Sequence, residues 1–106
     1  MSASPRVTVI TPTYNEKESL AELVRRIHSL RIENLEILVV DDNSPDGTGT
    51  LADELSKQYP LRVIHRTHKE GLGKAYVQAF GELIMLPANT RPDVVIQMDA
   101  DLSHNP

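Results

Sequence analysis

The sequence predicts an α/β fold, in which a mostly parallel sheet lies between two layers of helices. Short β-branched runs of strand length alternate with segments whose apolar residues recur at helical spacing. This alternation has the spacing of right-handed β-α-β units, which place successive strands parallel. The last apolar run, residues 94–98, lacks polar alternation, as do strands that are buried on both faces of a parallel sheet.

The strands are predicted from runs rich in Val, Ile and Leu that end at turn residues or at Pro. Pro12 is expected to end the first strand. Acidic pairs follow two of the strands, Asp41-Asp42 after the second and Asp99 with Asp101 after the fourth. The four predicted strands are residues 7–11, 35–40, 61–65 and 94–98.

Three helices are predicted between the strands, each with its apolar residues on one face. Pro60 is expected to stop the second helix, and Gly81 lies inside the third at a cost of up to ~1 kcal/mol relative to Ala. Loops are expected at residues 43–48, 67–74 and 87–92. The inward-facing residues are Leu20, Leu23, Val24, Ile27 and Leu30 in the first helix, Leu51, Leu55 and Tyr59 in the second, and Ala75, Tyr76, Ala79, Phe80, Leu83 and Ile84 in the third.

The composition is that of an ordinary globular domain, and we expect one domain over residues 1–106. The net charge of −4 argues against a nucleic-acid-binding protein that relies on a basic face. Cysteine is absent, which excludes a disulfide framework and a thiolate zinc site. No apolar stretch approaches the ~20 residues of a membrane span, so we expect a cytoplasmic protein.

The predicted topology brings three polar clusters together. A Rossmann-like half-sheet usually has the strand order 3-2-1-4, with its switch point between the first and fourth strands. Because the strands are parallel, residues 14–16, 41–42 and 99–101 would then lie along one edge of the sheet. We expect these clusters to converge on one crevice.

The carboxylates of Asp99 and Asp101 lie on the same side of an extended chain and can reach one hard cation. In one interpretation they hold Mg²⁺ or Mn²⁺ that bridges the phosphates of a nucleotide. In another, Asp99 is the nucleophile of a D-x-D phosphatase, although the downstream residues expected for such a site are missing. His104 can serve as a third ligand or contact a ligand.

The other motifs allow a functional and a structural interpretation. Asp42 can accept hydrogen bonds from a nucleobase or a ribose, or it can form the turn after the second strand. Tyr14 can stack on a base and Glu16 can accept from a ribose hydroxyl, or the two can close the end of the sheet and start the first helix. A G-x-G-x-x-G pattern is absent, and residues 71–74 favour a plain helix-start turn.

Together, four motifs resemble the dolichol-phosphate mannosyltransferases, which are inverting family 2 glycosyltransferases of the GT-A fold. The resemblance runs in order over residues 7–106, and its last motif points to the polyprenyl-phosphate mannosyl branch. The motifs are PTYNE at residues 12–16, VDDNSPDGT at 40–48, GLG at 71–73 and MDADLSH at 98–104.

The resemblance implies a GT-A nucleotide-binding half that uses GDP-mannose as donor and dolichyl or polyprenyl phosphate as acceptor. It implies Mg²⁺ or Mn²⁺ as cofactor, with Asp99 and Asp101 as metal ligands and Asp101 as the catalytic residue. The donor-binding positions that it implies are Pro12, Tyr14, Glu16, Val40, Asp42, Asp99, Ala100 and Asp101.

Family members continue well beyond the Asp-Ala-Asp segment, so we expect this chain to be the truncated, donor-binding half of the enzyme, with little or no transferase activity. The alternative is a non-catalytic fragment that binds a nucleotide or a metal. The fourth strand would be an exposed edge that favours self-association. The lipid acceptor implies peripheral association with the cytoplasmic face of a membrane.

Overall fold

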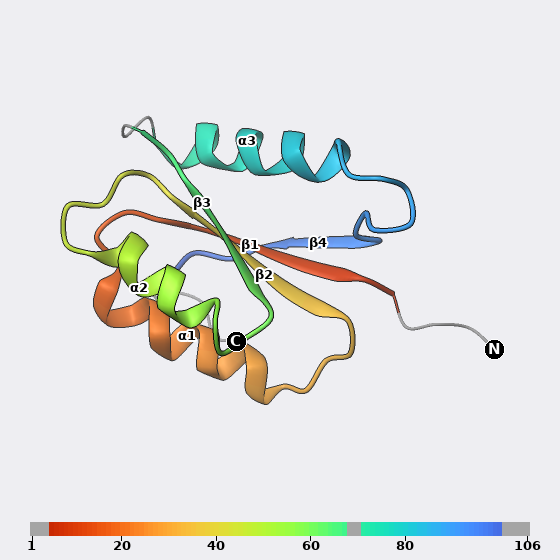
Figure 1. Ribbon diagram of the computed structural model, residues 1–106, viewed down its shortest axis with the longest axis horizontal. Helices are drawn as coiled ribbons and strands as arrows, with labels where there is room; N and C mark the ends of the chain where they lie inside the picture. Colours follow the sequence, from red (N-terminus) through yellow and green to blue (C-terminus); the bar gives the residue numbers. More distant parts are fainter. Residues whose placement is uncertain (1–4, 68–70, 101–106) are drawn as a thin grey trace.

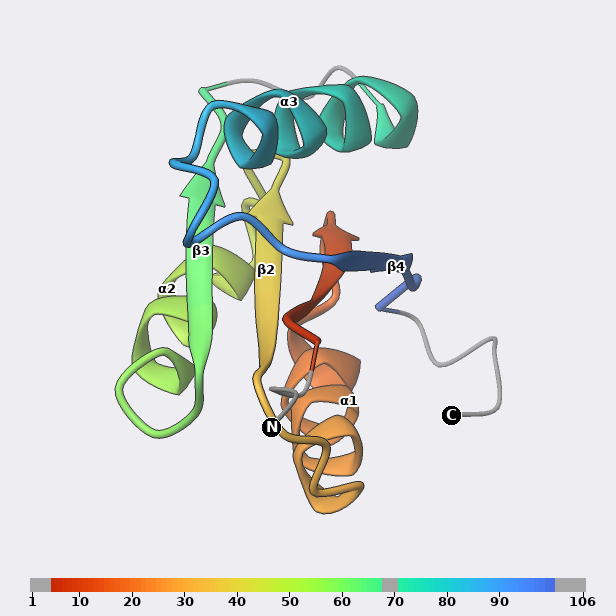
Figure 2. The same ribbon diagram turned by 90° about the vertical axis from the view of Figure 1, so that its right-hand side faces the viewer.

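A four-stranded parallel sheet with the order β3-β2-β1-β4 forms the centre of the protein. The computed structural model describes residues 5–67 and 71–100. Helices α1 and α2 cover one face of the sheet and α3 covers the other (Figures 1 and 2). This arrangement confirms the predicted strand order and the three-layer α/β/α architecture. The elements are β1 Val7–Thr13, α1 Lys17–Ser29, β2 Leu35–Asp41, α2 Thr48–Leu55, β3 Leu61–His65, α3 Leu72–Ile84 and β4 Val94–Gln97.

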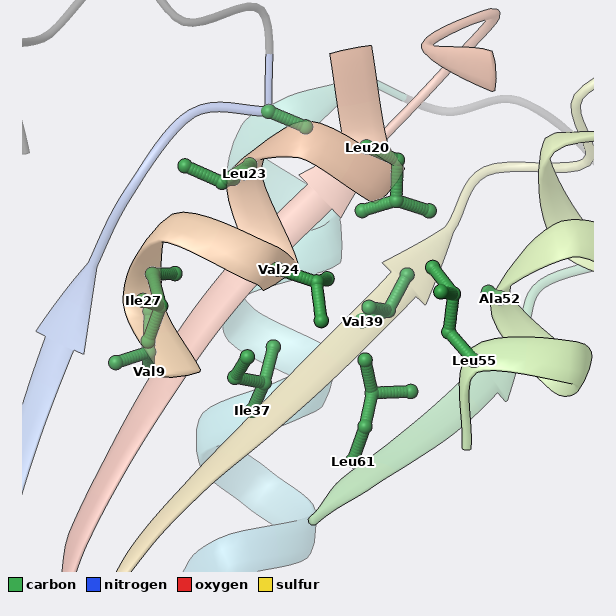
Figure 3. Close-up of a cluster of buried hydrophobic side chains, with 11 residues drawn as sticks. Val9, Leu20, Leu23, Val24, Ile27, Ile37, Val39, Ala52, Leu55 and Leu61 are labelled. Carbon is green, nitrogen blue, oxygen red and sulfur yellow. The ribbon is translucent and has the colours of Figure 1, made fainter. Parts of the chain in front are cut away.

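Successive side chains of the central strands point to opposite faces of the sheet and so belong to two separate hydrophobic clusters. Val9, Ile37 and Val39 point toward α1 and α2, where Figure 3 shows them packed among the apolar residues of both helices. The intervening residues of β1 and β2 pack against α3 on the opposite face. The second cluster consists of Ile10, Leu38, Val40, Ala75, Ala79 and Leu83.

The prediction that Pro12 ends the first strand is wrong, because β1 continues to Thr13 with Pro12 buried and opposite Val40. Val7 N donates to Asn34 O, and Thr13 O accepts from Asp42 N. The backbone groups of the odd-numbered residues of β1 therefore form their hydrogen bonds toward β2. Pro12 therefore faces the β4 side, where the strand pairing ends at Ile10. At that position a missing N–H costs no ladder hydrogen bond.

Four predicted helix features also differ from the structure. Ile84, which was expected to face inward on the third helix, is 64% exposed at the end of α3. Leu30 caps the C-terminal end of α1 and is 56% exposed, so it does not continue the buried stripe. Helix α2 ends at Leu55, ahead of Pro60, and Tyr59 packs against the core from the turn that follows. Helix α3 starts at Leu72 with Gly71 at its N-cap, inside the region predicted to be a loop.

Strand β4 is an edge strand and is not buried on both faces as its apolar sequence predicted. Val94 and Ile96 are 42% and 39% exposed, and they lie beside Val7 and Val9 of β1 in the register of the sheet. Val95 points to the other face and packs against the α3 cluster. In the described part of the chain, no helix combines the length and apolarity needed to cross a membrane.

Replacing Gly81 by Ala should stabilise the protein by about 0.5–1 kcal/mol, because glycine in a helix interior costs that much conformational entropy relative to Ala. Gly81 is exposed within α3, and an added Cβ would meet no atom within 4 Å. Urea denaturation monitored by circular dichroism measures the change. Gly71→Ala is the control and should destabilise, because Gly71 has a φ of +98°. A lower free energy of unfolding for Gly81→Ala would contradict the prediction.

Candidate functional site

The candidate site lies at the carboxyl edge of the sheet, where the segments that follow β1, β2 and β4 meet. Asp42 donates its backbone N–H to Thr13 O, which joins the ends of β2 and β1. At the end of β4, Ala100 O accepts a 2.5 Å hydrogen bond from Ser19 Oγ in the first turn of α1. The structure thus brings together the three polar segments that the sequence predicted to converge.

The loop after β2 and the first residue of α2 bind the backbone that leads into α1. Helix α1 has no cap from its own N-cap side chain, Glu16. Ahead of the helix, Asn15 N donates to Ser44 Oγ at 3.0 Å and Glu16 N donates to Thr48 Oγ1 at 3.0 Å. The first amide of the helix, Lys17 N, donates to Asp46 Oδ2 at 3.4 Å. The turn-forming residues of this motif therefore fix the start of a distant helix, a role that local sequence cannot reveal.

Asp46 is exposed, and hydrogen bonds hold its carboxylate in place. Burial acts to raise the pKa of Asp46, but bonds from the Thr48 hydroxyl, the Thr48 N–H and the Lys17 N–H lower it overall. A lowered pKa in the folded state means that the stabilisation is present above the ordinary pKa of an aspartate and is lost as the pH falls. The α1 cap is therefore complete at neutral pH.

Asp41 is buried, and its carboxylate serves the fold. Oδ1 accepts hydrogen bonds from Thr13 Oγ1 at 2.7 Å and from Ser44 Oγ at 2.6 Å, while Oδ2 accepts from Ser44 N at 3.0 Å. A Cβ on Gly49 would come within 3.1 Å of this carboxylate and of the His65 ring. The Asp41 carboxylate thus joins the end of β1 to the loop that follows β2.

Asp42 forms a buried ion pair with Arg66, a residue that the sequence analysis did not identify. Arg66 Nε lies 3.1 Å from Asp42 Oδ1, and the two side chains are 6% and 1% exposed. Asp42 Oδ2 accepts a 3.0 Å hydrogen bond from Gly71 N at the start of α3. The available signal in the sequence was that Arg66 directly follows β3 and Asp42 directly follows β2. These two strands pair in the sheet.

Asp99 is half-buried at the end of β4 and lies next to α3. Its Oδ1 accepts a 3.4 Å hydrogen bond from the hydroxyl of Tyr76. Burial, together with the neighbouring charge of Asp99, raises the pKa of Tyr76 to about 12. Tyr76 therefore keeps its proton at neutral pH and acts as a donor toward this carboxylate. Tyr76 was predicted to face the core, and its hydrogen bond to Asp99 was not predicted from the sequence.

The remaining predicted site residues divide by exposure. Pro12 and Val40 are buried opposite each other, whereas Tyr14 and Glu16 are half-buried in the connection from β1 to α1. Asp101 lies outside the described residues, as does His104. A pocket of about 410 Å³ borders this region and is lined by Asn15, Glu16, Lys17, Glu18, Ser19 and Asp46.

A larger pocket of about 910 Å³ lies at the opposite end of the sheet. Among the residues that line it, Leu35 and Pro60 mark the amino-terminal ends of β2 and β3. The Asp42 and Asp99 carboxylates lie at the carboxyl edge, so pocket size alone does not identify the site.

Among the predicted metal ligands, the described part of the site contains the half-buried carboxylate of Asp99. Within residues 5–67 and 71–100 no group of three His, Cys, Asp or Glu side chains could hold a metal ion. Mg²⁺ is commonly bound by one or two carboxylates together with phosphate oxygens of the substrate. The carboxylate oxygens of Asp99 fit such an ion, with Asp101 as the second predicted ligand.

Replacing Arg66 by Gln should destabilise the protein by about 3–5 kcal/mol, because it leaves the charge of Asp42 buried without its ion-pair partner. The matched control is Arg62→Gln on the same strand. Arg62 pairs with Glu36 at the surface, and its loss should cost about 1 kcal/mol or less. Chemical denaturation measures both values, and equal effects of the two substitutions would contradict the prediction.

Comparison with known proteins gives consistent results. The chain is 49% identical over 102 residues to a dolichol-phosphate mannosyltransferase of Pyrococcus furiosus, covering 95% of this chain and 27% of that protein. It is 50% identical over 103 residues to a polyprenol monophosphomannose synthase of Mycolicibacterium smegmatis, covering 95% and 37%. It thus spans about a quarter to two-fifths of the length of these relatives.

Among solved structures, a mannosyltransferase of Pyrobaculum calidifontis in complex with GDP-Man and Mn²⁺ superimposes with a TM-score of 0.77 at 31% identity. This match covers 94% of the present chain and 28% of the other. The model of the family described as glycosyl transferase family 2 matches residues 8–106. With its parallel sheet, its helix layers and its carboxylate-lined edge, the chain belongs to glycosyltransferase family 2.

Proposed function

We propose that this chain is the donor- and metal-binding part of an enzyme that transfers mannose from GDP-mannose to dolichyl or another polyprenyl phosphate, with inversion at the anomeric carbon. The observation that carries the proposal is the meeting of the three polar segments at one sheet edge, with Asp99 at the end of β4. The relatives named as polyprenol-phosphate mannosyltransferases support the substrates. The GDP-Man complex of the Pyrobaculum calidifontis mannosyltransferase supports the donor.

In this proposal the donor lies across the edge of the sheet. Tyr14 stacks on the base, and Glu16 and Asp42 accept hydrogen bonds from the nucleoside. Pro12 and Val40, which are buried opposite each other, form the floor beneath it. Ala100 with Asp99 and Asp101 binds the diphosphate and the metal, and Asp101 is the catalytic residue.

The charge of the site explains the need for a cation. Asp42 and Asp99 present negative charge at the edge where a diphosphate must bind, and the Arg66 charge is already paired with Asp42. Bound Mg²⁺ or Mn²⁺ supplies the positive charge that stabilises the departing diphosphate. Asp99 and Asp101 would hold that ion.

The chemical step needs little proton transfer from the protein. The acceptor phosphate is already largely ionised near neutral pH, so the site needs no dedicated general base. An acceptor phosphate oxygen forms the new bond to the anomeric carbon as the bond from that carbon to the GDP oxygen breaks. The protein contributes mainly by holding two anions in the reacting orientation.

A non-catalytic nucleotide- or metal-binding fragment is the second candidate. It requires only that the described edge bind a nucleotide or a metal, and product formation with donor, metal and lipid phosphate distinguishes it from the first. The D-x-D phosphatase receives no support, since the family match extends over residues 8–106.

The proposal also includes a location and a mode of association. A lipid-linked acceptor implies a cytoplasmic protein that works at the cytoplasmic face of a membrane. Because Val94 and Ile96 are exposed on β4, the proposal includes self-association of the chain through this strand.

Calorimetric titration should show binding of GDP-mannose that depends on Mn²⁺. Asp99→Asn and Asp101→Asn should each weaken this binding about tenfold or more, because a ligand worth about 1.5–3 kcal/mol is lost. Asp93→Asn is the matched control at the other end of β4, where Asp93 Oδ2 accepts from Arg6 N. A folded wild-type chain that binds no GDP-mannose with Mn²⁺ would contradict the proposal.

In a mannosylation assay with polyprenyl phosphate, the 106-residue chain should show little or no turnover even when it binds the donor. The physical reason is that transfer also requires the acceptor anion to be held in the reacting orientation, whereas the proposal assigns donor and metal binding to these residues. Product formation is measured against a longer relative assayed in parallel. Robust turnover by the purified chain would show that these residues suffice for catalysis.

A further inference from the structure

We propose that Tyr76 is a positioning residue for Asp99, whose Oδ1 it holds by a hydrogen bond while Oδ2 remains available to a divalent cation. The inference rests on the proposed donor site and extends it to a residue of α3. The geometry that carries it is the 3.4 Å contact between the Tyr76 hydroxyl and Asp99 Oδ1. Within the described residues, Tyr76 is the hydrogen-bond partner of the Asp99 side chain.

The ring of Tyr76 is fixed from the side opposite to its hydroxyl. Tyr76 is half-buried and packs against the cluster between α3 and the sheet, which includes Ile10 and Val40. A ring held by packing presents its hydroxyl with little loss of rotamer freedom. The hydroxyl can therefore orient a carboxylate at the end of the neighbouring strand.

The helix that carries Tyr76 is itself anchored to the other carboxylate of the site. Gly71 at the N-cap of α3 donates its N–H to Asp42 Oδ2 at 3.0 Å, and Asp42 is fixed by its ion pair with Arg66. The first turns of α3 thus connect the predicted nucleoside end of the site with its metal end. Asp42 and Asp99 come from different strands, and α3 contacts both.

The hydroxyl is suited to this role because it is an uncharged hydrogen-bond donor. A neutral donor engages one carboxylate oxygen without cancelling the negative charge that attracts the cation. Hydrogen bonds to metal-ligating groups typically change metal affinity 10–100-fold when they are removed.

The test compares Tyr76→Phe with Tyr59→Phe, each of which removes one hydroxyl and keeps the ring. Tyr59 is half-buried and contacts the ring of His28, away from the carboxylates. The dissociation constant of Mn²⁺ is measured by electron paramagnetic resonance in the presence of saturating GDP. Thermal denaturation of each variant is recorded without metal.

We expect Tyr76→Phe to weaken Mn²⁺ binding about tenfold and Tyr59→Phe to leave it unchanged. In an Asp99→Asn background, Tyr76→Phe should have no further effect on Mn²⁺ binding, since the two side chains act as a unit. A Tyr76→Phe variant that melts at a lower temperature but binds Mn²⁺ within twofold of wild type would overturn the inference and leave the proposed function intact. Absence of Mn²⁺-dependent GDP binding in the wild type would overturn both.

Discussion

The buried ion pair between Asp42 and Arg66 is the interaction on which the carboxyl edge of the sheet depends. Burying two charges is costly unless they are paired, and here Gly71 N also donates to the Asp42 carboxylate while main-chain bonds hold the two residues in place. Asp42 N donates to Thr13 O, Arg66 N donates to Asp41 O, and Gly71 N donates to Asp42 Oδ2. The ends of β1, β2 and β3 and the start of α3 therefore meet at this one pair.

A second set of contacts shows that residues of a family motif can serve the fold and the site together. Ser44, Asp46 and Thr48 accept hydrogen bonds from the three successive amides of residues 15–17, which link the segment carrying Tyr14 and Glu16 to the start of α1. The position of that segment consequently depends on a loop from another strand. A substitution in the loop would therefore alter the neighbouring site even where the substituted residue contacts no ligand.

Much of the architecture could be predicted from local patterns. Helical spacing identified the buried face of α1, and the parallel topology identified the edge where the acidic segments meet. Pro12 was misjudged because its tolerance depends on which side of β1 is paired, and the exposure of Val94 and Ile96 depends on what lies beside β4. A single sequence states neither of these facts.

The contacts of Arg66 and Tyr76 were missed for a related physical reason. Each joins residues that are more than twenty positions apart in the chain, Arg66 with Asp42 and Tyr76 with Asp99. Neither residue lies in a motif whose spacing predicts its partner. Periodicity assigns a side chain to a face of a helix or strand, but the tip of a long side chain can reach a group on another element.

The two layers of helices are held to the sheet by side chains of very different size. The described side chains that α3 buries are Ala75, Ala79 and Leu83, whereas α1 buries four larger ones: Leu20, Leu23, Val24 and Ile27. The fully buried side chains of α3 therefore remove less apolar area from water than those of α1, and the half-buried rings of Tyr76 and Phe80 supply the larger contacts of α3. Attachment of α3 thus depends on two rings at the margin of the core, and amide exchange along the chain would report how long each layer stays closed.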